Sequence, residues 1–301
     1  MKRISFALVL LLVAFLFISP AFAQEKSQKP VKFILGIKGF GGNWDFDNNH
    51  IWARRITGSY RMSTDLIPLG PFVEMSFAKD HIGLSAHYLM GRFRGDYHLK
   101  NNRYAENWYS TTESGTMKAD RQDIQVLLRL TPYFRYVSLL LGYQWLKYDH
   151  FERNGHGTWT EYSGEFDIPV GVYKYDVVRE ERNRVYGFIY GLGLRSPAYS
   201  GFYAWANGMW MPDMNIKYSS NWRMRYQAPD VPNNDGSLNL LSKVKGIKTE
   251  LGIAYGCTKV PLEFKLGWWL YTAKADEDRA KETPVFDEKL SGAEFSVGYM
   301  F

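Results

Sequence analysis

Carboxylates and histidines that lie close together in the sequence are the groups that could carry out acid–base chemistry in this chain. Asp45 and Asp47 are two residues apart, so on a strand both carboxylates would lie on one face and could form half of a hydrolytic site or bind a cation. Asp96 is followed two residues later by His98, and Asp213 stands in a separate polar segment. These five residues are the candidate catalytic groups. The alternative is that they are solvated groups of polar loops, where most charged side chains are found.

The remaining histidines give weaker patterns. Asp149 and His150 are adjacent, so on a strand their side chains would point to opposite faces. His150, Glu152 and His156 fall in one predicted loop, which is a weak pattern for a metal site, and the other histidines are scattered. We therefore predict no metal ion and no cofactor.

Composition excludes two broad classes of protein. Aromatic residues make up 17% of the 301 residues, which excludes intrinsic disorder because disordered chains are poor in aromatics. Cys257 is the single cysteine, so the chain holds no intrachain disulfide. The excess of aromatic residues and glycine is unusual for a soluble enzyme.

Residues 1–23 have the features of a secretory signal peptide. Lys2 and Arg3 precede an apolar stretch, and Ala21-Phe22-Ala23 forms a small-x-small cleavage site before Gln24. Cleavage near Ala23 leaves residues 24–301 as one domain and lowers the net charge from +6 to +4, because the removed segment carries two basic residues and no acids. No later stretch reaches the ~18 apolar residues of a spanning helix. The modest basic excess fits contact with anionic lipid, and we predict no nucleic-acid partner.

Apolar residues alternate with small or polar residues in about ten segments, which is typical of strands with two unlike faces. At the C-terminus, Phe295, Val297, Tyr299 and Phe301 alternate with serine, glycine and methionine. The other alternating segments lie at 31–38, 73–77, 82–91, 123–130, 137–145, 186–194, 247–255 and 262–270. Around residues 201–211 aromatic side chains occur at both parities, so the facing of that strand is ambiguous.

The connections between these segments alternate in length. Short ones lie near 79–80, 131–134, 196–201 and 258–261, and long polar ones lie at 41–69, 95–120, 150–182, 213–242 and 274–288. Short periplasmic turns and long external loops are typical of outer-membrane barrels. We therefore predict an all-β fold, a transmembrane up-and-down antiparallel β-barrel of about ten strands with five long external loops, located in the bacterial outer membrane. A soluble periplasmic β-sandwich is the alternative.

Charged residues also occur at positions that this arrangement would turn toward the barrel lumen. The bases are Lys32, Lys38, Arg129, Lys248 and Lys265, and the acids are Glu74, Asp123, Glu250, Glu263 and Glu294. Buried charges must pair, and a barrel of about ten strands has a narrow interior. We expect an ion-paired, largely closed lumen and not a wide channel.

The end of the chain and the barrel layout carry a family resemblance. Tyr299 and Phe301 resemble the C-terminal signal that outer-membrane barrels present to the barrel-assembly machinery, which is the implied partner. The order of about ten strands and five long loops resembles the omptin family of outer-membrane proteases. The segment LGYQWLKY, residues 141–148, is similar to an omptin strand that carries Tyr-Gln and then a basic residue before Tyr.

This resemblance implies a hydrolytic site with an Asp pair on one rim and an Asp-x-His-like pair on the opposite rim, activating water between them. After the third strand, however, the sequence offers only Asp96, and in the fourth loop Asn215 stands where the pattern needs histidine after Asp213. An amide cannot accept a proton from water as an imidazole can. We therefore expect weak or absent peptidase activity.

The resemblance also implies contact with lipopolysaccharide. Omptins carry tyrosine and a basic residue at the positions matched by Tyr143 and Lys147, with an acid between them that Trp145 replaces here. Arg92 and Arg94 continue the lipid-facing parity of their own strand, so they should emerge at the same height as Lys147. Cations at this height could pair with lipid A phosphates, or they could simply extend toward the headgroups, as basic side chains near membrane interfaces commonly do.

Three functions fit these patterns. The first is a non-catalytic outer-membrane barrel with exposed loops for binding or surface interaction, in which aromatic side chains serve as contact anchors. The tryptophans expected to be exposed for this purpose are Trp44, Trp52, Trp108, Trp159 and Trp222. The second is an omptin-like endopeptidase with a rearranged site, and the third is a small narrow pore.

Overall fold

The structure of the protein is a computed structural model, which describes residues 31–49, 56–77, 80–101, 109–132, 136–162, 169–257, 259–275 and 285–301. The predicted signal peptide lies outside these residues. None of the described segments is a helix long and apolar enough to cross a membrane. The chain forms ten named strands: β1 (Val31–Asn49), β2 (Ile56–Phe77), β3 (Ile82–Asn101), β4 (Tyr109–Leu130), β5 (Val137–Tyr162), β6 (Pro169–Arg195), β7 (Phe202–Tyr226), β8 (Asn234–Gly256), β9 (Leu262–Ala275) and β10 (Val285–Met300).

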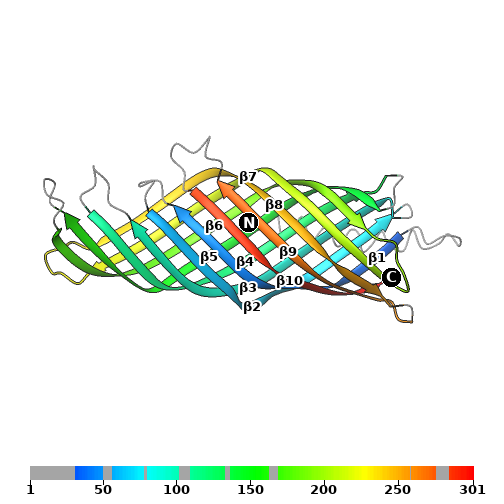
Figure 1. Ribbon diagram of the computed structural model, residues 1–301, viewed down its shortest axis with the longest axis horizontal. Coiled ribbons are helices and arrows are strands. Elements are labelled where there is room, and N and C mark those ends of the chain that lie inside the picture. The colour runs from blue at the N-terminus through cyan, green and yellow to red at the C-terminus, as the bar shows by residue number, and fades with distance from the viewer. Residues whose placement is uncertain are drawn as a thin grey trace.

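The ten strands close into one antiparallel barrel. Each strand pairs with its neighbours in sequence, and β1 closes the ring by pairing with β10 through registers such as Leu35 opposite Tyr299. Figure 1 shows the barrel from the side, with strongly tilted strands and blue β1 beside red β10. Closure leaves no free sheet edge, which is the condition for a β-structure to span a membrane. The predicted all-β barrel of about ten strands is confirmed.

Side chains alternate between the outside and the lumen of the barrel as the sequence predicts. On β5, Val137, Leu139, Leu141 and Tyr143 are exposed on the outside, while Gln144 and Leu146 are fully enclosed in the lumen. Exposed apolar side chains at the same level on the other strands include Met90, Phe188, Leu192, Leu251, Leu266, Phe295 and Val297. An outer wall of this kind is stable only against lipid or detergent, because water disfavours so large an apolar surface.

This apolar belt covers only part of the barrel's length. Its outward side chains run over nine residues on three strands, at 82–90, 137–145 and 186–194, which matches the ~9–11 residues of a membrane-crossing strand. The belt lies at the end of the barrel where the short connections and Phe301 are, since the Phe301 backbone N–H donates to the Phe33 carbonyl at 2.8 Å. Strands of up to 27 residues therefore continue beyond the belt as a polar extension.

The positions of the long loops differ from the sequence-based prediction. Ten segments that were expected in loops belong to strands: residues 41–49, 56–69, 95–101, 109–120, 150–162, 169–182, 213–226, 234–242, 274–275 and 285–288. These segments alternate between the lumen and the outside, yet polar residues occupy both faces, so hydropathy does not alternate along them. Residues 50–55, 102–108, 163–168 and 276–284 of the expected loops lie outside the described residues.

Residues 202–211, whose facing was ambiguous in the sequence, keep one parity: Phe202 and Trp210 are exposed outside, and Tyr203 and Met209 are buried in the lumen. The parity changes only after this segment. The pairing of β7 with β8 shifts between Met211 and Met214, so Met209 and Met211 face the lumen at one parity and Met214 faces it at the other. A bulge of this kind adds a residue to one strand and reverses the facing beyond it. Asp213 consequently points outward.

Candidate functional site

The candidate catalytic residues whose side chains the structure describes lie on the outer face of the barrel, beyond the apolar belt. Asp96 and His98 are exposed on β3, while Tyr97 between them is fully enclosed in the lumen. Asp45 on β1 is also exposed, and it faces Arg61 on β2, which in turn faces Asp96. Thus Asp45 and Asp96 flank one arginine on the outside of the barrel and do not border a lumen cleft.

The remaining candidates lie apart from this group. Asp213 is on β7, four strands away from both β1 and β3 around the ring, and its carboxylate pairs with Lys243 at 3.1 Å. The side chain of Asp47 lies outside the described residues. The structure therefore does not bring the described candidates together, and a catalytic role for any of them stays a prediction.

A cluster of carboxylates and tyrosines occupies the lumen of the polar extension, and it was not identified from the sequence. Glu113 on β4 accepts hydrogen bonds from the hydroxyls of Tyr97 at 3.0 Å and Tyr175 at 3.2 Å. Arg179 on β6 approaches Glu113 at 3.3 Å and pairs with Glu152 of β5 at 2.8 Å. One guanidinium thus joins two glutamate side chains inside the barrel.

Glu181, together with His150 and Tyr218, extends this cluster toward the apolar belt. Glu181 accepts a hydrogen bond from the Tyr218 hydroxyl at 2.7 Å, and the His150 ring nitrogen Nδ1 lies 3.7 Å from the Glu181 carboxylate. The side chains of Glu152, Glu181 and His150 are all 0% exposed. As predicted, adjacent Asp149 and His150 face opposite sides of the wall, with Asp149 outside. Among the described residues no group of acids, histidines and cysteine gathers in the way a metal ion requires.

Burial changes the chemistry of the Glu152 carboxyl. Burial raises its pKa to about 8, and the nearby Glu181 and Glu113 carboxylates add to this effect, whereas Arg179 opposes it. Burial also raises the pKa of Tyr97 and of Tyr175. A carboxyl that keeps its proton at neutral pH can act as an acid or base, but only on a substrate that reaches it.

The lumen is closed between this cluster and the membrane-embedded end. Arg121 pairs with Glu288 at 2.5 Å, and its guanidinium lies 4.9 Å from the Trp44 ring centroid. Below them, Lys248 donates to Gln125 at 3.2 Å across the barrel and lies 4.4 Å from the Trp269 ring centroid. The expected closed lumen is confirmed for the part of the barrel that the structure describes.

Four of the five predicted lumen bases have acidic partners. The pairs are Lys32–Glu263 at 3.0 Å, Lys38–Glu294 at 2.9 Å, Lys248–Glu250 at 2.9 Å and Lys265–Glu74 at 2.5 Å. The fifth base, Arg129, has no such partner among the described side chains.

The tryptophans expected as exposed anchors are placed differently. Trp44 is 0% exposed, so this prediction was wrong. Its segment is strand and not loop, and Trp44 continues the inward parity of Phe40 on β1. Trp159 and Trp222 are half-buried, and Trp52 and Trp108 lie outside the described side chains.

The four candidate lipid-binding residues lie on the outer face at or just beyond the apolar belt. Arg92 pairs with Asp120 at 2.7 Å, Arg94 lies 3.9 Å from Asp65, and Lys147 pairs with Asp149 at 2.5 Å. Asp120 faces both Arg92 and Asp149 across the strands, so the basic residues form one patch over β3, β4 and β5. Tyr143 stands within the belt against Phe188, with ring centroids 5.5 Å apart.

The proposed assembly residues end the apolar belt on β10. Phe301 is 63% exposed on the outside, and its ring contacts those of Tyr299 and Phe33 at centroid distances of 4.8 and 5.5 Å. The outward parity predicted for both residues is confirmed. Their role in assembly stays a prediction.

Comparison with known proteins supports the fold assignment. No protein-family profile and no curated protein sequence matches the chain. The barrel is similar to the outer membrane protease OmpT from Escherichia coli, with a TM-score of 0.54 and 11% identity over 92% of this chain and 99% of that chain. The predicted omptin-like layout is thereby confirmed as a fold.

Two further barrels are more distant. The translocator domain of the autotransporter NalP from Neisseria meningitidis has a TM-score of 0.37 and 10% identity, over 99% of this chain and 97% of that chain. The P. putida toluene transporter TodX has a TM-score of 0.30 and 10% identity, over 91% of this chain and 90% of that chain.

Proposed function

We propose that this protein resides in the bacterial outer membrane and presents the polar extension of its barrel at the cell surface as a binding surface. The nine-residue apolar belt supports the membrane location, and the features of residues 1–23 support export by the Sec pathway with cleavage near Ala23. In this orientation the short connections and Phe301 face the periplasm, and the strands beyond the belt face outward.

The observation that carries a non-catalytic function is the enclosure of the acid cluster. Glu152, Glu181 and His150 have the chemistry of a hydrolytic site, but their side chains are 0% exposed. A peptide bond cannot come within hydrogen-bonding distance of groups that no solvent reaches. The barrier of Arg121, Glu288 and Lys248 likewise argues against a pore.

The second candidate function is an omptin-like endopeptidase with a rearranged site. It is favoured by the fold similarity to an outer membrane protease and by the raised pKa of Glu152. Such an enzyme would need an opening of the polar extension that brings substrate to Glu152.

Peptide cleavage and conductance by the refolded mature chain in lipopolysaccharide-containing vesicles separate these functions. We expect no cleavage of a dibasic peptide and no single-channel conductance steps. Cleavage that is abolished by Asp213→Ala or by Glu152→Gln would establish the peptidase and contradict the binding function. Stable conductance steps from the wild type would instead establish a pore.

We propose two partners for this protein. Lipopolysaccharide would bind the outer face of the barrel, and the barrel-assembly machinery would recognise Tyr299 and Phe301. Arg92, Arg94 and Lys147 stand where lipid A phosphates of the outer leaflet would lie in this orientation. Charge-assisted contacts to phosphate are strong. Each of these bases already contacts a carboxylate, so a phosphate would have to share the base with that carboxylate or displace it.

A further inference from the structure

A cavity of about 460 Å³ occupies the lumen at the membrane-embedded end of the barrel. It is bordered by the short connections near Asp80, Thr131 and Ser196 and lies below the Lys248–Trp269 barrier. Its volume falls in the range of small-molecule sites, about 300–1,000 Å³. The surface-binding function proposed above does not involve this cavity.

Most charges that line this cavity neutralise one another. Each of its glutamates is held by a lysine: Glu74 by Lys265, Glu250 by Lys248, Glu263 by Lys32 and Lys265, and Glu294 by Lys38. After this pairing the lining keeps two arginines, Arg129 and Arg195, and the exposed Asp80 at its mouth. The lining as a whole is neutral, with five bases and five acids, and its two arginines have no carboxylate within ion-pair distance among the described residues.

Arg129 is the less satisfied of the two arginines. Its Nε is buried and has no hydrogen-bond partner among the described residues. The guanidinium lies over Gly83 of the neighbouring strand, where an added Cβ would come within 3.0 Å of both Nε and Nη2. Glycine thus leaves the room that Arg129 needs. A buried donor of a charged group is costly to leave unpaired, so the site calls for an acceptor.

Arg195 is held in place without being neutralised. Its guanidinium carbon lies 3.9 Å from the centroid of the Tyr203 ring, and the Tyr203 hydroxyl donates to Glu263 at 3.0 Å. No carboxylate pairs with Arg195 among the described residues. Stacking on an aromatic face fixes the guanidinium while its N–H donors stay available at the edge.

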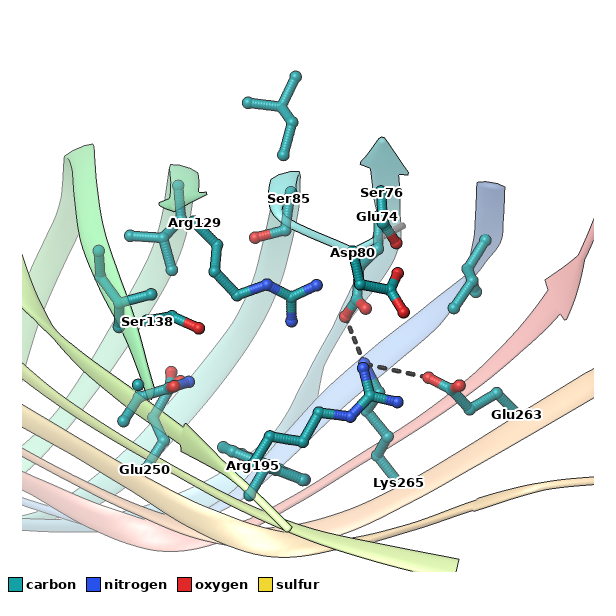
Figure 2. Close-up of a pocket in the computed structure, with 18 of the residues that line it drawn as sticks. Glu74, Ser76, Asp80, Ser85, Arg129, Ser138, Arg195, Glu250, Glu263 and Lys265 are labelled. Carbon is teal, nitrogen blue, oxygen red and sulfur yellow. Dashed lines mark hydrogen bonds and ion pairs between the residues drawn. The ribbon is translucent and has the colours of Figure 1, made fainter. Parts of the chain in front are cut away.

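The two arginines face one space across β5. Figure 2 shows both guanidinium groups extended into the cavity, with Ser85 and Ser138 also lining it. On the strand between them, Ser138 shares a hydrogen bond of 2.9 Å with Thr131 and faces Gly193, so small residues separate the arginines. Guanidinium forks and hydroxyls are the donors that bind oxyanions.

We propose that this cavity is a binding site for a small dianion bearing carboxylate or phosphate oxygens, held by Arg129 and Arg195. The site opens toward the end of the barrel that carries Phe301. It does not depend on the surface-binding function, because it lies at the opposite end of the closed lumen.

Calorimetric titration of the refolded mature chain in detergent micelles tests this proposal. The probes are sodium pyrophosphate and sodium succinate, with choline chloride as the cation control, all at constant ionic strength. We expect saturable binding of pyrophosphate or succinate with one site per chain, and the anion that binds distinguishes phosphate from carboxylate recognition. Arg129→Gln with Arg195→Gln should weaken binding by about tenfold per guanidinium removed.

The matched control is Arg153→Gln with Arg223→Gln, which removes the same charge from exposed positions on the polar extension. It should leave the affinity within about twofold of the wild type. Gly83→Ala provides a second variant that keeps every charge but displaces the Arg129 guanidinium, and it should also weaken binding. Absence of saturable binding of both anions to the wild type, or equal losses in the two double variants, would overturn the proposal.

Discussion

The side chains of Arg121 and Glu288 meet inside the barrel at 2.5 Å, although their strands, β4 and β10, are four positions apart around the ring. Both side chains are almost fully enclosed, at 3% and 0% exposure. The pair therefore braces two sides of the wall and closes the lumen at the same point. Trp44, Tyr148 and Tyr271 surround the guanidinium at 4.9–5.9 Å from their ring centroids.

Removing one member of this pair should destabilise the folded barrel far more than removing both. Glu288→Leu leaves the Arg121 charge buried without its partner, which should lower the free energy of unfolding by about 3–5 kcal/mol. The double variant Arg121→Leu with Glu288→Leu leaves no charge behind and should recover most of that loss. Urea unfolding in lipid vesicles measures all three proteins. If the double variant were as unstable as Glu288→Leu, the buried charge would not be the cause.

The enclosed Glu152 carboxyl should make stability depend on pH. Its pKa is about 8 in the folded protein against an ordinary value of 4.5, so between these values the folded state holds a proton that the unfolded state has lost. Stability should therefore fall as pH rises from 4.5 to 8. Glu152→Gln cannot titrate, and relative to the wild type it should gain at most about 1.4 kcal/mol per pH unit over this range.

Urea unfolding at several pH values measures this dependence. Glu180→Gln, on the neighbouring strand but outside the lumen, is the matched control and should follow the wild type at every pH. A difference between Glu152→Gln and the wild type that stays constant from pH 5 to 8 would contradict a protonated Glu152.

The barrel fold could be predicted because lipid imposes a clear pattern on the sequence. Between Val137 and Trp145 every second side chain must be apolar, and this alternation located the strand and its outer face. The same rule does not operate beyond the belt, where water surrounds the wall. There Tyr175, Val177 and Arg179 point inward while Asp176 and Val178 point outward, and neither set is uniformly apolar. In that region the sequence of a strand consequently cannot be distinguished from the sequence of a loop.

The lumen contacts were harder to predict for a different reason. The inward or outward direction of a side chain can be predicted from the alternation within a single strand. This prediction correctly placed Lys38, Lys248 and Lys265 inside the barrel. Which acid meets which base depends on the register of all the intervening strands and on the bulge between Met211 and Met214. Extending the parity of Gln144 through His150 would have placed Glu152 in the lumen. Its contact with Arg179 would still have required the β5–β6 register.

Deletion of Phe301 should impair assembly of the barrel. Its ring extends the outer apolar surface next to Tyr299 and Phe33, and its backbone N–H ties β10 to β1 at the closure of the ring. We expect less folded barrel in the outer membrane and unfolded protein in the periplasm. Fractionation with heat-modifiability on gels measures this. Wild-type amounts of heat-modifiable protein from the deletion variant would refute an assembly role.

Lipopolysaccharide binding should depend on the basic patch above the belt. Arg92 and Arg94 lie on β3 and Lys147 lies on β5, with β4 between them, at the height expected for lipid A phosphates. Each of these bases already contacts a carboxylate, Asp120, Asp65 or Asp149. These acids keep the bases oriented but compete with the phosphates, so net affinity should come from phosphates that bridge several bases at once. Combined Arg92→Ala, Arg94→Ala and Lys147→Ala should therefore weaken lipopolysaccharide binding by more than tenfold, measured with the refolded chain in detergent.

The control combines Arg153→Ala, Lys174→Ala and Arg223→Ala, which removes three exposed bases farther along the extension. Generic attraction to an anionic surface would reduce binding equally in both variants, whereas a phosphate clamp requires a much larger loss in the first.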